Sequence, residues 1–392
     1  MTIEAGLPLS TATRKTPSTD LAMMRAALAL ARRGLGISWP NPSVGCVIVK
    51  DGHVVGRGWT GRGGRPHGES EALRRAGVAA EGATAYVTLE PCSHWGQTPP
   101  CADALIAAGL RRVVVALEDP DPRVAGAGIE ALRKAGLTVE IGLCADEATE
   151  LNAGFLQRVR LGRPLVTLKL ATSLDGRIAT ATGESRWITG PAARDRAHLL
   201  RATHDAILVG IGTVIADDPQ LTCRLPGLAG RSPVRIVLDR HLRIAPTARL
   251  IAEARQVPTW VVTLPSAGKA AEKRLRDAGV EVLAVSPDAA GLIDLAAVLL
   301  LLGKRGVTRL LVEGGSRVAA ALLRADLVDR LVWLHAPLLL GNDGIPAVES
   351  LVRDELAAMP RFERVATEVA GEDVMALFRV RRPAENGTPE QR

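Results

Sequence analysis

The chain has 392 residues, and its 49 Lys and Arg against 42 Asp and Glu give a formal net charge of +7. At about 150 residues per domain, this length allows two or three domains and argues against a single small binding module. Hydrophobic residues make up 47% of the chain and charged residues 23%, a composition that excludes intrinsic disorder as its general state.

The N-terminal segment, residues 1–19, is expected to be a disordered tail. Met1 to Asp20 has no continuous apolar run, so it lacks the hydrophobic region of a secretory signal. A helical pattern follows over 21–33, and Thr19 or Asp20 is the residue expected to cap it.

A hairpin and a βαβ series come next in the chain. Apolar runs over 44–50 and 53–58 flank Asp51-Gly52, a dipeptide that favours a tight turn between strands. Helices and strands then alternate, which implies a mainly parallel sheet covered by helices. The expected elements are helices over 69–76, 102–108 and 128–135 and strands over 83–89, 112–117 and 137–141.

A junction between two domains is expected at Arg160–Pro164, after a helical stretch over 145–159. One domain then covers 20–159, and the second, a further α/β series with about eight strands, covers 165–381. Its strands are expected over 165–171, 206–209, 234–238, 260–264, 280–285, 309–312, 331–335 and 374–380, and its helices over 191–202, 269–278, 295–304 and 317–323. The last residues, 382–392, are rich in Pro, Glu, Asn and Gly and are expected to be disordered.

The apolar stretches, the cysteines and the charge limit which cellular compartment and which partners are expected. The most apolar stretch, Leu295–Leu302, is far shorter than the roughly 20 residues that cross a bilayer. The five cysteines are odd in number and thinly spread, which indicates a cytoplasmic protein and makes paired cysteines candidate metal ligands. Only seven of the basic residues are Lys, and the Arg residues are scattered, as a biased coding composition or an anionic, phosphorylated substrate would explain.

The segment from His67 to Cys101 carries the most informative motif. His67-Gly-Glu69 is followed by Glu90-Pro-Cys92 and then by Pro100-Cys101. This order is typical of zinc deaminases, in which one His and two Cys bind Zn²⁺ and leave the fourth position to a water whose pKa falls towards neutrality. Taken singly, each residue could be an ordinary surface or core residue, but the combination favours a metal site.

Glu69 is expected to carry a proton and not to bind the metal. It can take the proton from the water and pass it to the leaving amine only if it stands beside that water. His67 and Cys101 lie at helix starts and Cys92 at a strand end, so we expect all three at the carboxyl edge of the sheet, where open α/β folds build their sites.

Eight residues separate Cys92 from Cys101, where the general signature has two. This longer insert, together with Asn41–Cys46 and Thr88–His94, resembles the deaminase half of the bifunctional riboflavin-biosynthesis deaminase-reductases. Five further motifs resemble the reductase half of the same family, in order and at similar spacing, so the resemblance covers about residues 20–380. They are Lys169–Arg177, Gly183–Thr189, Val209–Pro219, Leu221–Arg224 and Val312–Ser316.

The resemblance implies a cytidine-deaminase-like N-terminal domain and a dihydrofolate-reductase-like C-terminal domain, both α/β. It implies that the first half uses Zn²⁺ to remove an amino group from a phosphorylated diaminopyrimidine ribosylamine. The second half then reduces the ribosyl group of the deaminated uracil product to ribityl with a hydride from NADPH. Independently, Glu313–Ser316 follows a strand and opens a helix, where glycines let backbone N–H groups approach a phosphate.

The residues implied for the reductase form two sets. The cofactor contacts are Ala171, Trp187, Thr213, Asp217, Arg240, Gly315, Ser316, Arg317, Val318, Ala319, Ala320 and Ala321. The substrate contacts are Ser185, Arg201, Leu221, Arg224 and Glu313. The two Arg of this set suit a phosphate because guanidinium can pair with it bidentately. Lys169, Asp217 and Glu313 are the candidates for the proton donor.

Several positions depart from the commonest family pattern. Gly68 stands where Ala is usual, Trp95 replaces a second His, and Ala171-Thr172 replaces a Gly-Ala pair. Arg240 stands where a small hydroxyl residue contacts the cofactor; it could reach the 2′-phosphate of NADPH or be a plain surface Arg.

Two other functions are weighed against this one. A deaminase of nucleobases or tRNA with an inactive C-terminal domain would have a Cys-x-x-Cys pair and would lack the cofactor motifs. A nucleic-acid-binding protein would cluster its basic residues among aromatics, which make up only 3% of this chain. The oligomeric state stays open, a homo-oligomer included.

Overall fold

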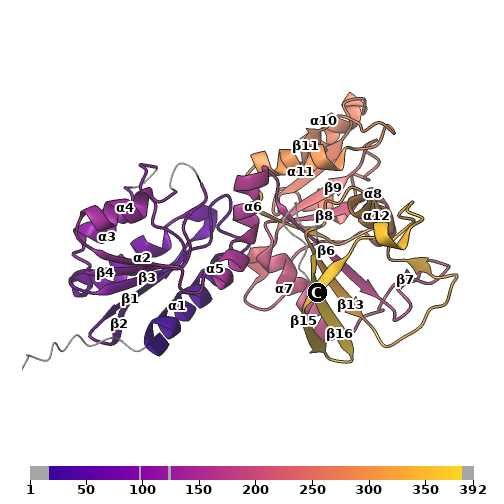
Figure 1. Ribbon diagram of the computed structural model, residues 1–392. Helices are drawn as coiled ribbons and strands as arrows, with labels where there is room; N and C mark the ends of the chain where they lie inside the picture. Colours follow the sequence, from indigo (N-terminus) through magenta and orange to yellow (C-terminus); the bar gives the residue numbers. More distant parts are fainter. Residues whose placement is uncertain (1–16, 97–98, 122–124, 382–392) are drawn as a thin grey trace, which may run out of the picture. The chain divides into compact units, whose positions relative to one another are not determined.

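The computed structural model describes residues 17–96, 99–121 and 125–381 and divides the chain into two compact units (Figure 1). The first unit combines 1–33, 44–60 and 66–151; the second combines 34–43, 61–65 and 152–392, each within the described residues. Most of both expected tails, 1–16 and 382–392, lies outside those residues.

The boundary between the units differs from the junction expected at 160–164. The helix expected over 145–159 is broken at Asn152 into α5 (Ala145–Leu151) and α6 (Ala153–Leu161), and α6 belongs to the second unit. Asn152 is buried, and its side chain accepts a hydrogen bond from the Ser43 N–H and donates one to the Ser43 carbonyl. Two short segments, 34–43 and 61–65, also join the second unit, which periodicity could not predict.

The first unit is a five-stranded sheet in the order β2-β1-β3-β4-β5, with helices on both faces (Figure 1). Its strands are β1 (Gly45–Lys50), β2 (His53–Trp59), β3 (Thr84–Val87), β4 (Arg112–Val115) and β5 (Thr138–Ile141). Its other helices are α1 (Pro17–Ala31), α2 (Gly68–Ala76), α3 (Cys101–Ala107) and α4 (Ala127–Lys134). Strands β3, β4 and β5 are parallel, and the β1–β2 hairpin turns at Asp51-Gly52, both with positive φ, so the predicted hairpin is confirmed.

The expected cap of the first helix is wrong. Helix α1 already begins at Pro17, so Thr19 and Asp20 lie inside it, and its first residues replace the end of the expected tail. The Asp20 carboxylate instead accepts hydrogen bonds from Tyr86 on β3 and Arg112 on β4.

The second unit is built on a nine-stranded sheet in the order β11-β10-β9-β8-β12-β6-β13-β16-β15. The seven strands from β11 to β13 are parallel, and β16 and β15 are antiparallel additions at one edge. The strands are β6 (Leu165–Thr172), β8 (Ala206–Gly210), β9 (Val234–Leu238), β10 (Thr259–Thr263), β11 (Glu281–Ala284), β12 (Arg309–Val312), β13 (Arg330–His335), β15 (Phe362–Ala370) and β16 (Asp373–Val380). A separate ribbon pairs β7 (Arg177–Ala179) with β14 (Ile345–Pro346).

Two groups of helices cover this sheet through separate core clusters. One cluster includes α11 (Leu295–Lys304) and α12 (Ser316–Arg324), and the other includes α8 (Ile211–Asp217), α9 (Arg249–Ala252) and α10 (Lys269–Asp277). Helix α7 (Pro191–Thr203) contributes Leu200 to the second cluster. Across the described part of the chain, no helix has both the length and the apolar character needed to span a membrane.

Sequence patterning missed β15 and the short helices α8 and α9. Strand β15 is an edge strand whose residues are mostly exposed and carry charges on both faces, so it shows no apolar alternation. Its position is decided by backbone pairing with β16, a long-range contact that a local pattern does not contain.

Candidate active sites

Three side chains of the first unit converge as the zinc-deaminase signature predicts. The ligand atoms of His67, Cys92 and Cys101 all lie within 4.8 Å of one another. The Nδ1 atom of His67 is 3.2 Å from the Sγ of Cys101 and 3.7 Å from the Sγ of Cys92. One imidazole and two thiols at this separation match the donor set of a tetrahedral zinc site that keeps one position open.

Local structure explains how the three ligands meet. His67 directly precedes α2, Cys101 is the first residue of α3, and Cys92 follows β3 by a short loop. The Cys101 N–H donates a hydrogen bond to the Cys92 sulfur over 3.3 Å, so a helix N-terminus faces that sulfur. Gly68 suits this packing, because a Cβ there would lie only 2.7 Å from the Val44 carbonyl oxygen.

The pKa values of the two cysteines are shifted in opposite directions. A hydrogen bond from the Cys101 thiol is the main cause that lowers the pKa of Cys92 to about 4. The same bond, with burial, raises the pKa of Cys101 well above its ordinary value. The pair therefore holds one thiolate readily, and a bound cation would favour the second.

Glu69 lies beside this cluster with an unpartnered oxygen. Its side chain is buried, and within the described residues its Oε2 atom has no hydrogen-bond partner. Burial raises the pKa of Glu69 to about 7, although the neighbouring His67 opposes that shift. A buried carboxyl with a free oxygen next to three zinc-type donors fits a site built for an additional polar group, so the residues present fit a zinc ion.

Glu90 supports the Cys92 side of the cluster, a role that motif reasoning did not assign. Its buried carboxylate accepts four backbone hydrogen bonds of 2.9–3.2 Å from a loop and from the start of α4. The donors are Asp119, Gly126, Gly128 and Ile129. This ties the end of β3 to the neighbouring α4, and the only sequence signal for it is a Glu two residues before the ligand.

A second polar cluster lies at the carboxyl ends of β6 and β12. The Glu313 side chain, only 5% exposed, binds Arg201 through two contacts of 2.7 and 2.9 Å and lies 3.7 Å from the Lys169 Nζ. Burial alone would raise the pKa of Glu313, but Arg201 and Lys169 outweigh it and lower that pKa to about 2. Burial is also the main cause that lowers the pKa of Lys169.

The predicted cofactor turn lies between β12 and α12. A Cβ at Gly314 would lie 2.9 Å from the Thr213 Oγ1, so α8 packs directly against this turn. Gly315 has a φ of 88°, which only glycine adopts without strain, and Ser316 opens α12. Ala319 and Ala320, which the resemblance includes among the cofactor contacts, are buried in the helix face towards the core.

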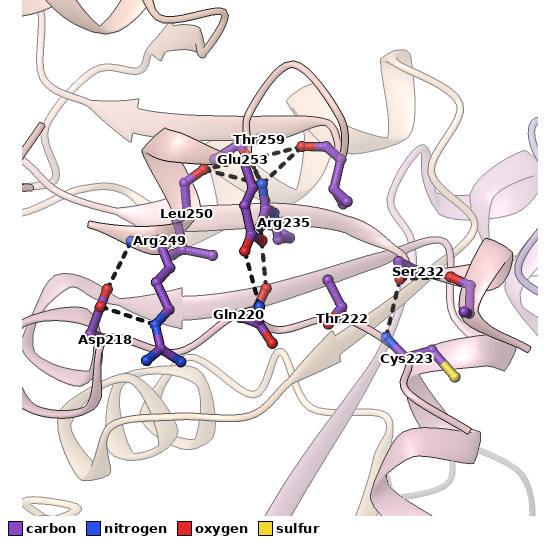
Figure 2. Close-up of polar contacts among 12 residues, drawn as sticks. Asp218, Gln220, Thr222, Cys223, Ser232, Arg235, Arg249, Leu250, Glu253 and Thr259 are labelled. Carbon is purple, nitrogen blue, oxygen red and sulfur yellow. Dashed lines mark hydrogen bonds and ion pairs between the residues drawn. The ribbon is translucent and has the colours of Figure 1, made fainter. Parts of the chain in front are cut away.

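The segment that carries the expected substrate contacts Leu221 and Arg224 is held by polar groups along its length. Figure 2 shows Asp218, Gln220 and Cys223 of this segment with their polar partners elsewhere in the chain. The Thr222 carbonyl accepts a hydrogen bond from Arg201, and the Cys223 N–H donates one to the Ser232 Oγ. The segment is thereby linked to the Glu313 cluster through Arg201.

The other predicted reductase contacts are less enclosed. Trp187 is 68% exposed and packs under the guanidinium of Arg194, 4.5 Å from its ring centre, and Ser185 nearby is half-buried. Ala171 lies at the end of β6 and Asp217 at the end of α8. Arg240 is exposed just after β9, and within the described residues no hydrogen bond or ion pair joins it to Glu313.

Family models match both halves of the chain. The model of the RibD C-terminal domain matches residues 164–376, and that of the cytidine and deoxycytidylate deaminase zinc-binding region matches residues 17–117. Full-length relatives agree with this division. The riboflavin biosynthesis protein RibD of Escherichia coli strain K12 is 47% identical over 364 residues, which cover 90% of this chain and 96% of the relative. RibD of Aquifex aeolicus is 41% identical, over 92% of this chain and 98% of its own.

Solved structures are similar over nearly the whole chain. RibD of Acinetobacter baumannii has a TM-score of 0.84 and 41% identity and covers 93% of this chain and 99% of its own. A diaminohydroxyphosphoribosylaminopyrimidine deaminase/5-amino-6-(5-phosphoribosylamino)uracil reductase from Thermotoga maritima has a TM-score of 0.82 and 34% identity at the same coverage. These similarities extend through both sites.

Proposed function

Because the chain belongs to the RibD family and is a bifunctional deaminase and reductase of riboflavin biosynthesis, we propose that it catalyses two consecutive steps on phosphorylated pyrimidine ribosylamines. The first is hydrolytic deamination of a diaminohydroxyphosphoribosylaminopyrimidine, and the second is reduction of 5-amino-6-(5-phosphoribosylamino)uracil. The alternative of a base or tRNA deaminase with an inactive second domain is contradicted, since both halves match one bifunctional family.

In the deaminase half, His67, Cys92 and Cys101 would hold the zinc ion. When bound, zinc supplies a Lewis acid that lowers the pKa of water towards neutrality. Glu69 takes a proton from the attacking water and delivers it to the amino group as the C–N bond breaks and ammonia leaves. The observation that carries this assignment is the buried Glu69 with an unpartnered oxygen beside three zinc-type donors.

In the reductase half, the proposed cofactor is NADPH, which supplies a hydride to C1 of the ribosylamino group in its open imine form. The turn at Gly314–Ser316 would approach its phosphates, with contacts from Thr213, Asp217 and the first turn of α12. Arg240 would interact with the 2′-phosphate. The remaining proposed cofactor contacts are Ala171, Trp187 and residues 317–321.

The proposed substrate site surrounds Glu313. Arg201 and Arg224 would bind the phosphate of the substrate, and Ser185 and Leu221 would contact the rest of the molecule. Glu313 stays ionised because of its cationic neighbours, so it would hold Arg201 and accept a hydrogen bond from the substrate. Lys169 is the candidate of this cluster that can donate a proton, since Glu313 carries none at neutral pH.

Compartment and partners complete the proposal. All five cysteines are free, in keeping with a cytoplasmic enzyme. The proposed ligands include no nucleic acid, and the proposed function is compatible with a homo-oligomer.

A stopped assay tests both steps at once. The full chain is incubated with the pyrimidine ribosylamine phosphate and NADPH, and ammonia release and NADPH oxidation are scored separately. We expect ammonia without NADPH present, and NADPH oxidation only after deamination. NADPH oxidation without prior ammonia release would contradict the proposed order.

A further inference from the structure

A fully buried guanidinium lies next to the reductase site and takes no part in the contacts proposed so far. Arg235 on β9 has 0% exposure and is the largest fully buried side chain of the described residues. Within the described part of the chain one carboxylate pairs with it, that of Glu253, whose side chain is 26% exposed. Burying a charge costs free energy, and an apolar residue of similar volume commonly stabilises a core as much as a buried ion pair does. The presence of Arg235 at this position therefore needs a specific explanation.

Arg235 joins β9 to three separate backbone segments. Its Nη1 donates to the Gln220 carbonyl over 3.3 Å and to the Glu253 Oε2 over 3.1 Å. Its Nη2 donates to the carbonyls of Leu250 and Val257 over 3.1 and 3.0 Å. The contact with Gln220 is the one that reaches the segment of the proposed substrate contacts (Figure 2).

Gln220 is held a second time, through its side chain. Its Nε2 donates to the Glu253 Oε1 over 2.9 Å, so Glu253 binds Arg235 with one oxygen and Gln220 with the other. The next residue, Leu221, is buried and has a φ of 56°, a left-handed conformation that is strained for a branched side chain. Such a conformation persists where the surrounding structure fixes it, and here the double anchor immediately precedes it.

We propose that Arg235 and Glu253 are positioning residues for the reductase substrate, because together they fix Gln220 and thereby hold Leu221 and Arg224 in place. This rests on the proposed function, which assigns Leu221 and Arg224 to the substrate. The pair acts through the backbone and touches neither substrate nor cofactor. Its loss therefore weakens substrate binding, while the cofactor turn at Gly314–Ser316 belongs to another strand and keeps its structure.

Glu253→Met is the primary variant, because methionine is similar in length and removes both carboxylate acceptors. We expect the KM for the deaminated substrate to rise about fivefold, with kcat and the KM for NADPH within about twofold of the wild type. Glu253→Gln is the conservative variant: its amide oxygen accepts from Arg235, and its amide N–H donates to the side-chain oxygen of Gln220 once that amide has turned over, so the substrate KM should stay near the wild-type value.

The matched control is Glu281→Gln. Glu281 on β11 is 40% exposed and pairs with Arg305, and within the described residues this pair makes no contact with residues 217–224. This control should leave all reductase constants unchanged, and ammonia release should be unchanged in every variant. Arg235→Lys keeps a donor for Gln220 and should be milder than Arg235→Met, but Glu253→Met decides the test if the Arg235 variants do not fold.

Two results would overturn the inference. An unchanged substrate KM in Glu253→Met, in a protein where Arg224→Gln does weaken substrate binding, would refute the positioning role and leave the proposed substrate site intact. A fall in kcat with an equal rise in both KM values, which Glu253→Gln shows as well, would mean a merely structural role. If Arg224→Gln itself leaves the substrate KM unchanged, the substrate assignment fails and the inference fails with it.

Discussion

At the scale of single residues, the two proposed sites use buried carboxylates in opposite ways. Burial raises the pKa of Glu69 to about 7, so this residue can both accept and release a proton near neutral pH. Glu313 is also buried, but Arg201 and Lys169 lower its pKa to about 2. One carboxyl is therefore suited to carry a proton, and the other to act as a fixed anion that orients cations.

Replacing Glu69 separates proton transfer from metal binding. In Glu69→Ala we expect ammonia release to fall by at least about a thousandfold, because general acid–base catalysis and the placement of water are both lost. Zinc content, measured by metal analysis, should stay near one per chain because the three ligands remain. Glu71→Ala, an exchange two residues along α2, is the control; loss of zinc from Glu69→Ala would contradict the assigned role.

A substitution of Arg201 tests its bidentate ion pair with Glu313. Arg201→Lys keeps the charge but cannot form both contacts with Glu313 and a third with the Thr222 carbonyl. We expect the substrate KM of the reductase to rise about tenfold with the deaminase unchanged, as measured by initial rates. Arg196→Lys, an exposed position on the same helix, serves as the control. Equal kinetics for the two variants would argue against a substrate role of Arg201.

At the scale of elements, helix α7 ends on a buried histidine. His204 follows the helix, its Nδ1 lies 2.7 Å from the Leu200 carbonyl, and its Nε2 lies 2.9 Å from the Thr167 Oγ1 on β6. Burial, together with Arg309, lowers the pKa of His204 to about 4 from an ordinary 6.5. The neutral imidazole thus fastens α7, which carries Arg201, to the strand that carries Lys169.

This histidine should make stability depend on pH. The pKa of His204 is lower in the folded than in the unfolded protein. Its contribution to the free energy of unfolding is therefore complete above pH 6.5 and is lost as the pH falls from there towards 4. At 1.36 kcal/mol per pKa unit, the shift corresponds to on the order of 3 kcal/mol. In His204→Gln the urea midpoint should fall less between pH 7 and pH 5 than in the wild type. His53→Gln, at an exposed position, should keep the wild-type slope; an identical slope in His204→Gln would refute the assignment.

At the scale of the whole molecule, the two units carry separate chemistry in one chain. The zinc ligands and Glu69 all belong to the first unit, and the Glu313 cluster belongs entirely to the second. Each of these two clusters of described residues therefore comes from a single unit. The scattered Arg residues gain a specific explanation only in part: Arg201 pairs with the buried carboxylate of Glu313, and the buried Arg235 pairs with the partly exposed Glu253.

Removing the metal should therefore divide the activities. After treatment with a chelator, we expect ammonia release to disappear, while NADPH oxidation persists with the deaminated intermediate as substrate. Readdition of Zn²⁺ should restore ammonia release, and a parallel measurement of both products checks this. If NADPH oxidation is lost together with zinc, the two sites are not independent.

The family and the His67, Cys92 and Cys101 cluster were readable from the sequence, and the proposed role of Glu69 as proton carrier rests on the same motif. Short motifs such as His67-Gly-Glu69 fix both the residue types and their spacing within one turn or loop, and the chemistry of zinc depends on those residue types. The hairpin at Asp51-Gly52 and most parallel strands were predicted for the same reason, because apolar runs and turn residues act locally.

Tertiary structure alone decided the break at Asn152, the edge strand β15 and the pairing of Arg201 with Glu313. It also decided that Arg235 lies buried against Gln220. Each of these depends on contacts between residues far apart in the chain, whose free energy comes from burial and from pairing of charges that no local pattern records. The sequence therefore determined which groups are proposed to perform the chemistry, and the packing of the sheet determined which of them face one another.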